Sequence, residues 1–226
     1  NAANISWMPA TALTNTTILT PTASPVNTIK YFVTASLGTC THTDSIELIV
    51  WDAPTANAGE DIPICYGITA QLNGSGGLDY QWTPDPTFVS ATDIINPVVK
   101  PSVTTAYYLH VKDINGCSSL EADEVKVIVT PSVKIFAGND TIIAISQPLQ
   151  LNAIDKNNSG VTKWEWSSTA FLDNPFIANP VAIFTSPVTT FPYEYIYTVT
   201  GTTPVGCQNF DQIKIKVYQG PDIYVP

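Results

Sequence analysis

The sequence predicts an all-β protein, built as a tandem of antiparallel two-sheet β-sandwiches. Three observations predict it: a composition rich in turn formers, short segments that alternate apolar and polar residues, and an internal repeat. The 226 residues include 18 Pro and 12 Gly, and 10% are aromatic. Such a composition favours short strands and turns over helices. No segment keeps a helical period with capping residues over about ten positions.

Alternation is clearest near the end of the chain. Residues 213–217 read Ile-Lys-Ile-Lys-Val, which places apolar side chains on one face and lysines on the other. Residues 107–111 and 193–199 alternate in the same way. Each pattern is typical of a strand with one buried face. His110 falls between two apolar neighbours, so we expect it on the solvent face, and His42 in a turn.

An internal repeat divides the chain. Each copy contains a Trp, then a Tyr, then a turn ending in Cys, and finally an alternating strand. The Trp-to-Trp steps are 75 and 84 residues, the length of a whole domain. An early Trp and a late Tyr are typical of immunoglobulin-type sandwiches. The copies carry, in this order, Trp7, Tyr31 and Cys40; Trp82, Tyr107 and Cys117; Trp166, Tyr193 and Cys207.

A second signal marks where copies begin. Ala-Gly-Glu-Asp at 58–61 and Ala-Gly-Asn-Asp at 137–140 lie 79 residues apart. We therefore expect complete repeats at 54–130 and 131–219. Residues 1–53 form the second half of another repeat, whose missing strands we expect before residue 1. We expect residues 220–226 to form the lead-in to a following module.

The four cysteines suggest a disulfide within the second repeat, the one copy that holds two of them. A bond between Cys65 and Cys117 closes a loop of about 50 residues and contributes roughly 4 kcal/mol in the chain-entropy model. Ala144 occupies the matching place in the third repeat, so Cys207 lacks a partner there. The alternative is that these cysteines are small buried apolar residues. A disulfide predicts an oxidising compartment outside the cytosol.

Charge excludes some functions. The chain has nine basic residues, all Lys, against 19 acidic ones, for a net charge of −10. A net-acidic chain without Arg repels nucleic acid and anionic lipid. No run of about 18 apolar residues is present to span a membrane.

Several segments of the second repeat resemble the PKD-like, immunoglobulin-like repeats of bacterial surface proteins. They are Ala-Asn-Ala-Gly-Glu-Asp-Ile-Pro-Ile-Cys at 56–65, Leu-Asn-Gly-Ser-Gly-Gly at 72–77, Tyr-Gln-Trp-Thr-Pro at 80–84 and Asp-Ile-Asn-Gly-Cys at 113–117. Such repeats occur in giant adhesins that Bacteroidota export through the type IX secretion system. Residues 220–226 resemble the lead-in to the C-terminal sorting module of gliding-motility proteins.

The resemblance implies a non-catalytic stalk or adhesion region of a large cell-surface adhesin, including those of gliding cells. Its implied location is extracellular, attached to the outer membrane. Its implied partners are the type IX secretion machinery, outer-membrane attachment proteins, and extracellular surfaces or polysaccharide. Asp-Ser/Thr-aliphatic tripeptides are O-glycosylated in this bacterial group, which makes Ser45 and Thr141 candidate glycosylation sites. Chance tripeptides are the alternative.

Catalytic and metal sites are not indicated. No nucleophile elbow, zinc-protease motif or phosphate loop occurs, so we expect no enzyme. Oxygen ligands for Ca²⁺ are present but sparse, without a dense acidic loop, and we expect no bound metal. The candidate calcium ligands are Asn57, Glu60, Asp61 and Asp79, and in the third repeat Asn139, Asp140 and Asp155.

Aromatic residues raise one binding hypothesis. Trp164 and Trp166 have the same parity on one strand and should share a face, either in the core or as a sugar-stacking ligand contact. A rival interpretation makes the chain an accessory, carbohydrate-binding region of a secreted multidomain hydrolase. Glycan binding at Trp164 and Trp166, if measured, would favour that rival interpretation.

Overall fold

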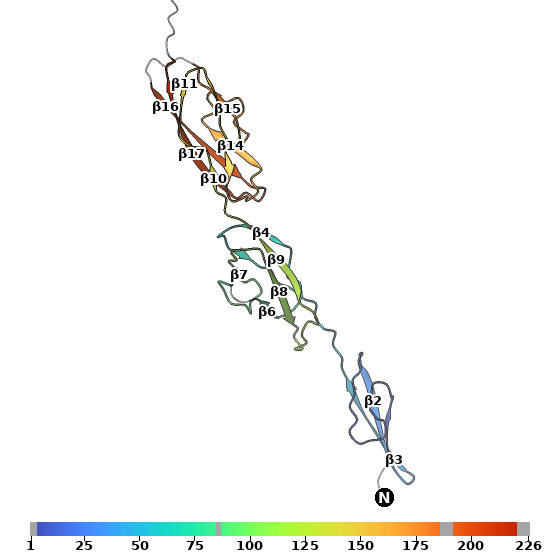
Figure 1. Ribbon diagram of the computed structural model, residues 1–226. Coiled ribbons are helices and arrows are strands. Elements are labelled where there is room, and N and C mark those ends of the chain that lie inside the picture. The colour runs from blue at the N-terminus through green and yellow to red at the C-terminus, as the bar shows by residue number, and fades with distance from the viewer. Residues whose placement is uncertain (1–3, 85–86, 186–191, 221–226) are drawn as a thin grey trace, which may run out of the picture.

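The computed structural model describes residues 4–84, 87–185 and 192–220, and every regular element in these ranges is a β-strand. The strands form three groups that follow one another along an elongated molecule (Figure 1). Each sheet takes all its strands from one group. The predicted all-β tandem of immunoglobulin-like sandwiches is thus confirmed. Of the expected lead-in at 220–226, residues 221–226 lie outside the described residues.

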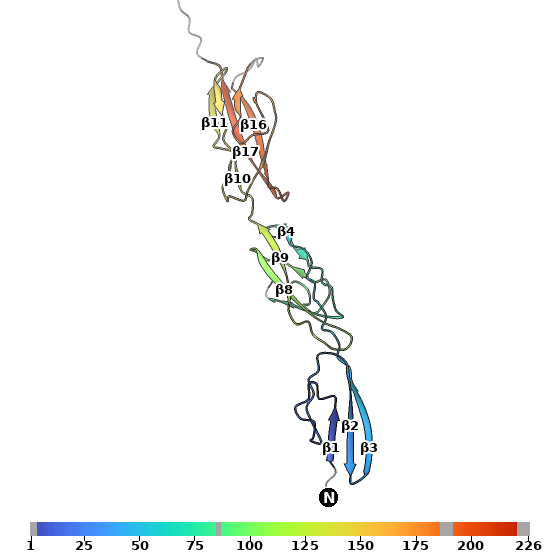
Figure 2. The same ribbon diagram turned by 90° about the vertical axis from the view of Figure 1, so that its right-hand side faces the viewer.

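The first module is a single antiparallel sheet (Figure 2). It consists of β1 (Asn4–Met8), β2 (Ile29–Leu37) and β3 (Cys40–Leu48), in the order β1-β2-β3. Among its described residues the one buried large side chain is Tyr31, at 1% exposure. A lone sheet leaves one of its apolar faces without a second layer, so this module has little core.

The second module is a sandwich. A four-stranded sheet in the order β4-β9-β8-β6 faces a two-stranded sheet of β5 and β7. Alternate residues of β9 are buried, and the module has a core cluster of its own. Its strands are β4 (Ile62–Cys65), β5 (Ala70–Gln71), β6 (Asp79–Thr83), β7 (Val98–Val99), β8 (Thr105–Lys112) and β9 (Asp123–Thr130).

The third module repeats this plan. Its four-stranded sheet has the order β11-β17-β16-β14, and β12 pairs with β15 and β10 with β13 in two small sheets. The strands are β10 (Ile135–Phe136), β11 (Thr141–Ala144), β12 (Pro148–Gln150), β13 (Ile154–Asp155), β14 (Lys163–Ser167), β15 (Val181–Ile183), β16 (Tyr193–Thr202) and β17 (Gln208–Tyr218).

Pairing at one sheet edge departs from the antiparallel expectation. Strand β4 runs parallel to β9, and β11 runs parallel to β17. The reason is the tandem arrangement, in which the chain enters each module at one end and leaves at the other (Figure 1). Within the four-stranded sheet of such a module, the first and last strands along the chain run in the same direction, so the ladder between them is parallel.

The Trp of each module is fixed by the same hydrogen bond. The indole Nε1–H of Trp82 donates to the Ile94 carbonyl at 3.1 Å, and that of Trp166 donates to the Ile177 carbonyl at 2.9 Å. In the first module the indole of Trp7 donates to the Ile18 carbonyl at 3.0 Å. A buried indole needs such a partner. The bond closes the segment that follows the Trp strand over the ring.

A buried Tyr on the strand that neighbours the Trp strand in the sheet makes a similar hydrogen bond in each module. The hydroxyls of Tyr31 and Tyr197 donate to the carbonyls of Thr11 and Ala170, each at 2.7 Å. The Tyr107 hydroxyl lies 2.6 Å from the Thr87 hydroxyl. Tyr197, and not Tyr193 as the repeat predicted, is thus the counterpart in the third module. The predicted Tyr of the third repeat is therefore four residues too early, because tyrosines recur along β16 with the same parity.

Alkaline pH is expected to destabilise the third module through Tyr197. In the folded chain, burial raises the pKa of the Tyr197 phenol well above its ordinary value. In the unfolded chain the same phenol ionises near pH 10. The stabilisation is therefore complete below pH 10 and is lost above it, at about 1.4 kcal/mol per pH unit. Urea unfolding between pH 10 and 11.5 measures this slope.

The matched variants separate the tyrosines. Tyr197→Phe should reduce the slope by about that amount. Tyr218→Phe, which removes a phenol that is 42% exposed, is the matched control. An equal slope in both variants would assign the effect to other groups.

The Ala-Gly-x-Asp motif proves to be a brace between the opening segment and the last strand. The Ala58 amide donates to the Asp123 carboxylate at 2.8 Å, and the Lys126 amide donates to the Asp61 carboxylate at 2.8 Å. The two hydrogen bonds point in opposite directions across the same edge. Each carboxylate therefore satisfies an amide that the parallel ladder leaves free.

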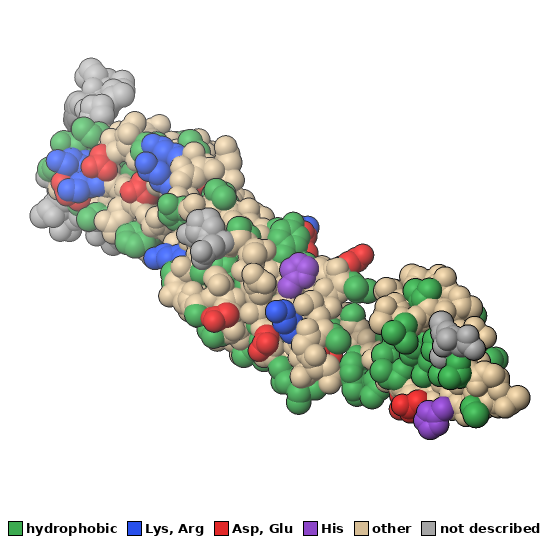
Figure 3. Space-filling view, turned by 90° about the horizontal axis from the view of Figure 1, so that it is seen from below, with side chains coloured by type: hydrophobic (Ala, Val, Ile, Leu, Met, Phe, Trp, Pro, Cys, Tyr) green, Lys and Arg blue, Asp and Glu red, His purple; other side chains and the backbone are tan. Residues whose placement is uncertain are grey.

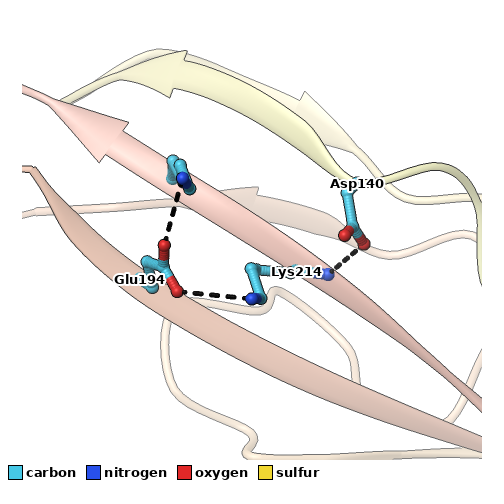
Figure 4. Close-up of polar contacts among 4 residues, drawn as sticks. Asp140, Glu194 and Lys214 are labelled. Carbon is cyan, nitrogen blue, oxygen red and sulfur yellow. Dashed lines mark hydrogen bonds and ion pairs between the residues drawn. The ribbon is translucent and has the colours of Figure 1, made fainter.

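The third module contains the same brace. The Ala137 amide donates to Asp211 at 2.9 Å. The Lys214 amide donates to Asp140 at 2.9 Å (Figure 4). Beside it Glu194 forms ion pairs with the ammonium groups of Lys216 and Lys214, at 3.3 and 3.5 Å. The hydrogen bond from Lys216 is the main cause that lowers the pKa of Glu194. These exposed pairs add little stability.

Removal of the Asp123 carboxylate is expected to destabilise the second module. Asp123→Ala leaves the part-buried Ala58 amide without its acceptor, which costs about 1–3 kcal/mol. Asp44→Ala is the matched control, since Asp44 has the same place on β3 and, among the described residues, its carboxylate accepts from the adjacent Ser45 amide alone. Urea unfolding of both variants tests the difference. Equal losses would show that the brace contributes nothing.

Candidate functional site

The candidate functional site is the junction between the second and third modules, where a disulfide crosses the boundary. Cys65, the last residue of β4, is bonded to Cys207, in the turn between β16 and β17. Their Cα atoms lie 5.5 Å apart and 142 positions apart in the sequence. The predicted Cys65–Cys117 bond is therefore wrong, and Cys117 is a free, half-buried thiol.

The correction has a geometric cause. Cys65 pairs with Thr130, the residue at which the chain leaves the second module. Cys117 lies in the β8–β9 turn, beside the Lys112–Ser118 bridge. The β8–β9 turn and the end of β9 are at opposite ends of the sheet, so the two cysteines of this module cannot meet. Their module-internal pairing was inferred from the sequence because both fall in one repeat.

Short-range contacts surround the disulfide. Cys207 is 6% exposed, and Cys65 packs against the core of the third module. The Asn209 side-chain amide donates to the Val133 carbonyl at 2.9 Å, which ties the linker to the start of β17. In the chain-entropy model a cross-link over 142 residues contributes about 5 kcal/mol. The junction is therefore held covalently and by packing.

A shallow hollow of about 320 Å³ lies beside the disulfide. Its lining includes the exposed apolar residues Tyr66 and Ile68 of the second module and Gln208 and Asn209 of the third. The Tyr66 amide donates to the Thr130 carbonyl at 3.0 Å, which continues the β4–β9 ladder by one residue. The hollow is open, and the Tyr66 phenol is the one titratable side chain among the described residues that line it.

The tryptophans predicted to contact a ligand lie on β14. Trp166 is 1% exposed and makes an edge contact with Tyr197 at 6.5 Å between ring centroids. Trp164 is half-buried and packs against the same core. They share a face, as predicted, but that face is the inner one. Trp166 is therefore not available for stacking on a sugar.

Four of the seven candidate calcium ligands accept hydrogen bonds from the protein. Asp61 and Asp140 accept the backbone hydrogen bonds of the two braces, and Asn57 accepts from the Gly59 amide at 2.9 Å. Asp155 accepts from the Ser159 hydroxyl at 2.9 Å. Within the described ranges no group of three His, Cys, Asp or Glu side chains could hold a metal ion. Asn57 and Asp155 therefore stabilise local turns, whereas Asp61 and Asp140 join the opening segments to the last strands.

The two histidines lie on exposed surface. His110 is on the outer face of β8, as the alternation predicted. The expectation of a turn at His42 is wrong, because β3 begins at Cys40 and His42 pairs with Ala35 of β2. The His110 ring lies 3.3 Å from the Ser119 hydroxyl, in a hollow of about 590 Å³ that Asp79 and Asp93 also line. That hydroxyl accepts the Val111 amide, at 3.2 Å. Within the residues that the structure describes, no hydrogen bond joins a carboxylate to His110.

The glycosylation candidates differ in access. Ser45 is exposed on β3, whereas Thr141 is partly buried at the start of β11. Modification of either stays a prediction. Cys40 is an exposed free thiol at the tip of the β2–β3 hairpin. No helix long and apolar enough to cross a bilayer occurs among the described residues.

No protein-family model and no curated protein sequence matches the chain. Solved structures of tandem immunoglobulin domains match it in fold. A three-domain I-band fragment of titin has a TM-score of 0.50 and 11% sequence identity, and the match covers 97% of this chain and 88% of the titin chain. A Glu-to-Ala variant of those titin domains has a TM-score of 0.51, with 10% identity and the same coverages. The structure of Drosophila OTK, extracellular domains 3–5, has a TM-score of 0.46 and 10% sequence identity, and the match covers 96% of this chain and 86% of that chain.

At such low identity the two titin structures indicate a common fold and nothing more specific. The fold is the tandem of immunoglobulin-like β-sandwiches described above. The functional residue that sequence reasoning missed is Cys207 as the partner of Cys65. The available signal was positional: one cysteine ends an opening strand, and the other lies in a hairpin turn at the facing end of the next module.

Proposed function

We propose that the chain is a non-catalytic stalk region of a large secreted adhesin, in which disulfides between modules stiffen the rod. The observation that supports it most is the Cys65–Cys207 bond across a module boundary. A staple in this place restricts bending and twisting at the linker, which a rod needs and an isolated domain does not. Disulfides persist in oxidising, extracellular environments.

The shape and surface agree with this role. The modules follow one another in an extended row, so each added module carries the next one further from an anchor (Figure 1). The surface is acidic overall, and only 12% of residues are charged. Such a surface stays soluble through its net charge and hydroxyls and offers only weak contacts of its own.

The resemblance of residues 56–65 and 113–117 to repeats of Bacteroidota surface proteins supports a finer proposal. The parent protein is exported by type IX secretion, is attached to the outer membrane through partner proteins, and binds extracellular surfaces or polysaccharide. Gliding cells are the proposed setting. In a bacterium that displays the parent protein, inactivation of the type IX secretion machinery should remove it from the surface.

A replacement experiment tests the stalk function. In cells that display the parent protein, residues 54–219 are either deleted or exchanged for two unrelated sandwiches of similar length with one disulfide between them. A stalk predicts that deletion weakens adhesion and that the exchange restores it. If the exchange abolishes adhesion as completely as deletion does, these modules bind the surface themselves and the stalk proposal is wrong. Glycan binding by the purified chain would then favour the accessory region of a hydrolase.

A further inference from the structure

The first module presents a sheet edge that is covered in the other two. Strand β3 is at the edge of its sheet and pairs on its inner side with β2 (Figure 2). The corresponding strands β9 and β17 carry β4 and β11 on their outer side. In the part of the chain that the structure describes, no strand takes that place on β3. An open edge of this kind is a template for pairing with another strand.

The face beside this edge is also uncovered. Ile46, opposite Tyr31, corresponds to Val125, opposite Tyr107. Ile46 is 51% exposed, whereas Val125 is 0% exposed. Trp7 is partly exposed, although the equivalent Trp82 is 2% exposed. Apolar side chains accordingly gather on the surface of the first module (Figure 3).

The second module indicates what covers such a face. A Cβ placed on Gly74 would lie 2.9 Å from the Trp82 ring, so the opening segment packs directly on that indole. Ala58 and Leu72, from the same segment, are 1% and 0% exposed. The occupant that fits the first module is therefore an opening segment of the same type.

The polar groups needed for that occupant are in place. Asp44, opposite Val33, has the position of Asp123, opposite Leu109, whose carboxylate accepts the Ala58 amide. The described contact of the Asp44 carboxylate is with the adjacent Ser45 amide, at 2.7 Å. An Ala-Gly-x-Asp segment would add the second half of the brace through the amide of Glu47, the counterpart of Lys126.

Cys117 has the surroundings of the stapled Cys207. The Cys117 carbonyl accepts from the Asp113 amide at 3.0 Å, and the Cys207 carbonyl accepts from the Thr203 amide at 2.9 Å. The side chains of Asp113 and Thr203 in turn accept the amides of these cysteines, at 2.8 and 3.1 Å. The two hairpin turns are therefore the same, and Cys117 is free where Cys207 is bonded.

The linkers also match. Seven positions separate Trp51 from Ala58, as they separate Thr130 from Ala137. Trp51 is the counterpart of Thr130, the residue that pairs with Cys65. A cysteine at the end of a strand added to β3 would therefore lie beside Trp51 and face the turn that holds Cys117.

We propose that the first module accepts an Ala-Gly-x-Asp opening strand parallel to β3, and that a cysteine ending this strand forms a disulfide with Cys117. The first and second modules are then stapled as the second and third are. Bond formation removes two protons and two electrons from the two thiols. A small-molecule disulfide such as oxidised glutathione accepts them and leaves as two thiols. The inference extends the stapled stalk of the proposed function but rests on repeat geometry and not on adhesion.

A graft supplies the missing strand within the chain. Residues 54–78, which directly precede β6, are placed before Asn4 in the full chain, because Asp79 precedes Trp82 by three positions just as Asn4 precedes Trp7. After oxidation with glutathione, we expect the titratable thiols to fall from the two of the ungrafted chain, Cys40 and Cys117, to Cys40 alone. Peptide mapping should recover the grafted cysteine joined to Cys117. Exchange of the Glu47 amide should slow by about tenfold or more.

Two control grafts separate docking from bonding. A graft with Ala for its cysteine, the residue found at Ala144, should protect the Glu47 amide and leave both thiols free. A graft of the same composition in scrambled order should leave the Glu47 amide unprotected and give three free thiols, namely Cys40, Cys117 and its own cysteine. Three free thiols with an unprotected Glu47 amide in the unscrambled graft would overturn the proposal, as would a bond to Cys40 or docking only between two copies. An unbonded but docked graft would overturn the Cys117 staple. None of these readouts involves secretion or adhesion. A failed graft would therefore overturn this inference alone and would leave the stalk proposal to its own test by cell adhesion.

Discussion

Reduction of the Cys65–Cys207 disulfide is expected to lengthen the fully unfolded chain under force by about 500 Å. The bond bypasses 142 residue positions, and each extended residue spans about 3.3–3.6 Å. When the chain is pulled from its ends, force therefore passes through the disulfide and not through the bypassed segment. Single-molecule pulling with and without reductant measures the difference.

A cysteine variant provides the control for this measurement. Cys207→Ser in oxidising buffer should reach the length of the reduced wild-type chain. A bond between Cys65 and Cys117 would give a difference of only about 180 Å, because it bypasses far fewer residues. Equal lengths with and without reductant would contradict any disulfide within the chain. The three outcomes are well separated.

The expected behaviour bears on the stalk proposal. Most of the second module, and the third module up to Cys207, lie between the bonded cysteines. In the oxidised chain the force bypasses these residues, so their unfolding adds no length to the rod. A stalk built in this way keeps its length under load. The first module is outside the loop and has little core, so it should yield first unless its open face is covered.

Removal of the Trp82 side chain is expected to unfold much of the second module. Trp82 is 2% exposed and lies beneath the opening segment, which packs on it at Gly74. Replacing a buried Trp by Ala costs about 3–5 kcal/mol, a large part of the stability of a small domain. Thermal unfolding followed by circular dichroism, together with hydrogen exchange resolved by module, measures the loss.

The matched variants use the other tryptophans. Trp7→Ala should cost clearly less, because Trp7 is already partly exposed in the first module. Trp51→Ala should stay within about 0.5 kcal/mol, since Trp51 is 55% exposed and lies outside the strands. Equal losses in all three variants would mean that burial of the ring does not decide the stability of its module.

Local patterns predicted the strands well. The alternation at 107–111 and 213–217 places the same residues inward in β8 and β17 as in the structure. Period-two alternation is a property of a single strand, so it is readable without knowledge of the partner strand. The choice of Tyr193 over Tyr197 failed for the same reason: both have the inward parity, and only pairing with β17 tells them apart.

The site was less predictable. Asp61 and Asp140 are candidate calcium ligands by sequence, although no bound metal is expected, and in the structure they accept backbone amides from β9 and β17. Trp166 was read as a core residue or a ligand contact, and it proves to be core. A carboxylate beside a turn looks the same in a sequence whether its partner is an ion, water or a distant amide.

The sequence by itself determined the strands, the repeat of Trp and Tyr, and the all-β tandem, because each depends on side chains close together along the chain. Only the tertiary structure decided which thiol meets Cys65 and which face of the first module stays open. Disulfide pairing requires Cα atoms within about 7 Å, and that distance depends on which ends of successive modules meet. Cys65 and Cys207 satisfy it from different modules, at 5.5 Å. Membership of one repeat brought Cys65 and Cys117 together in the alignment but not in space.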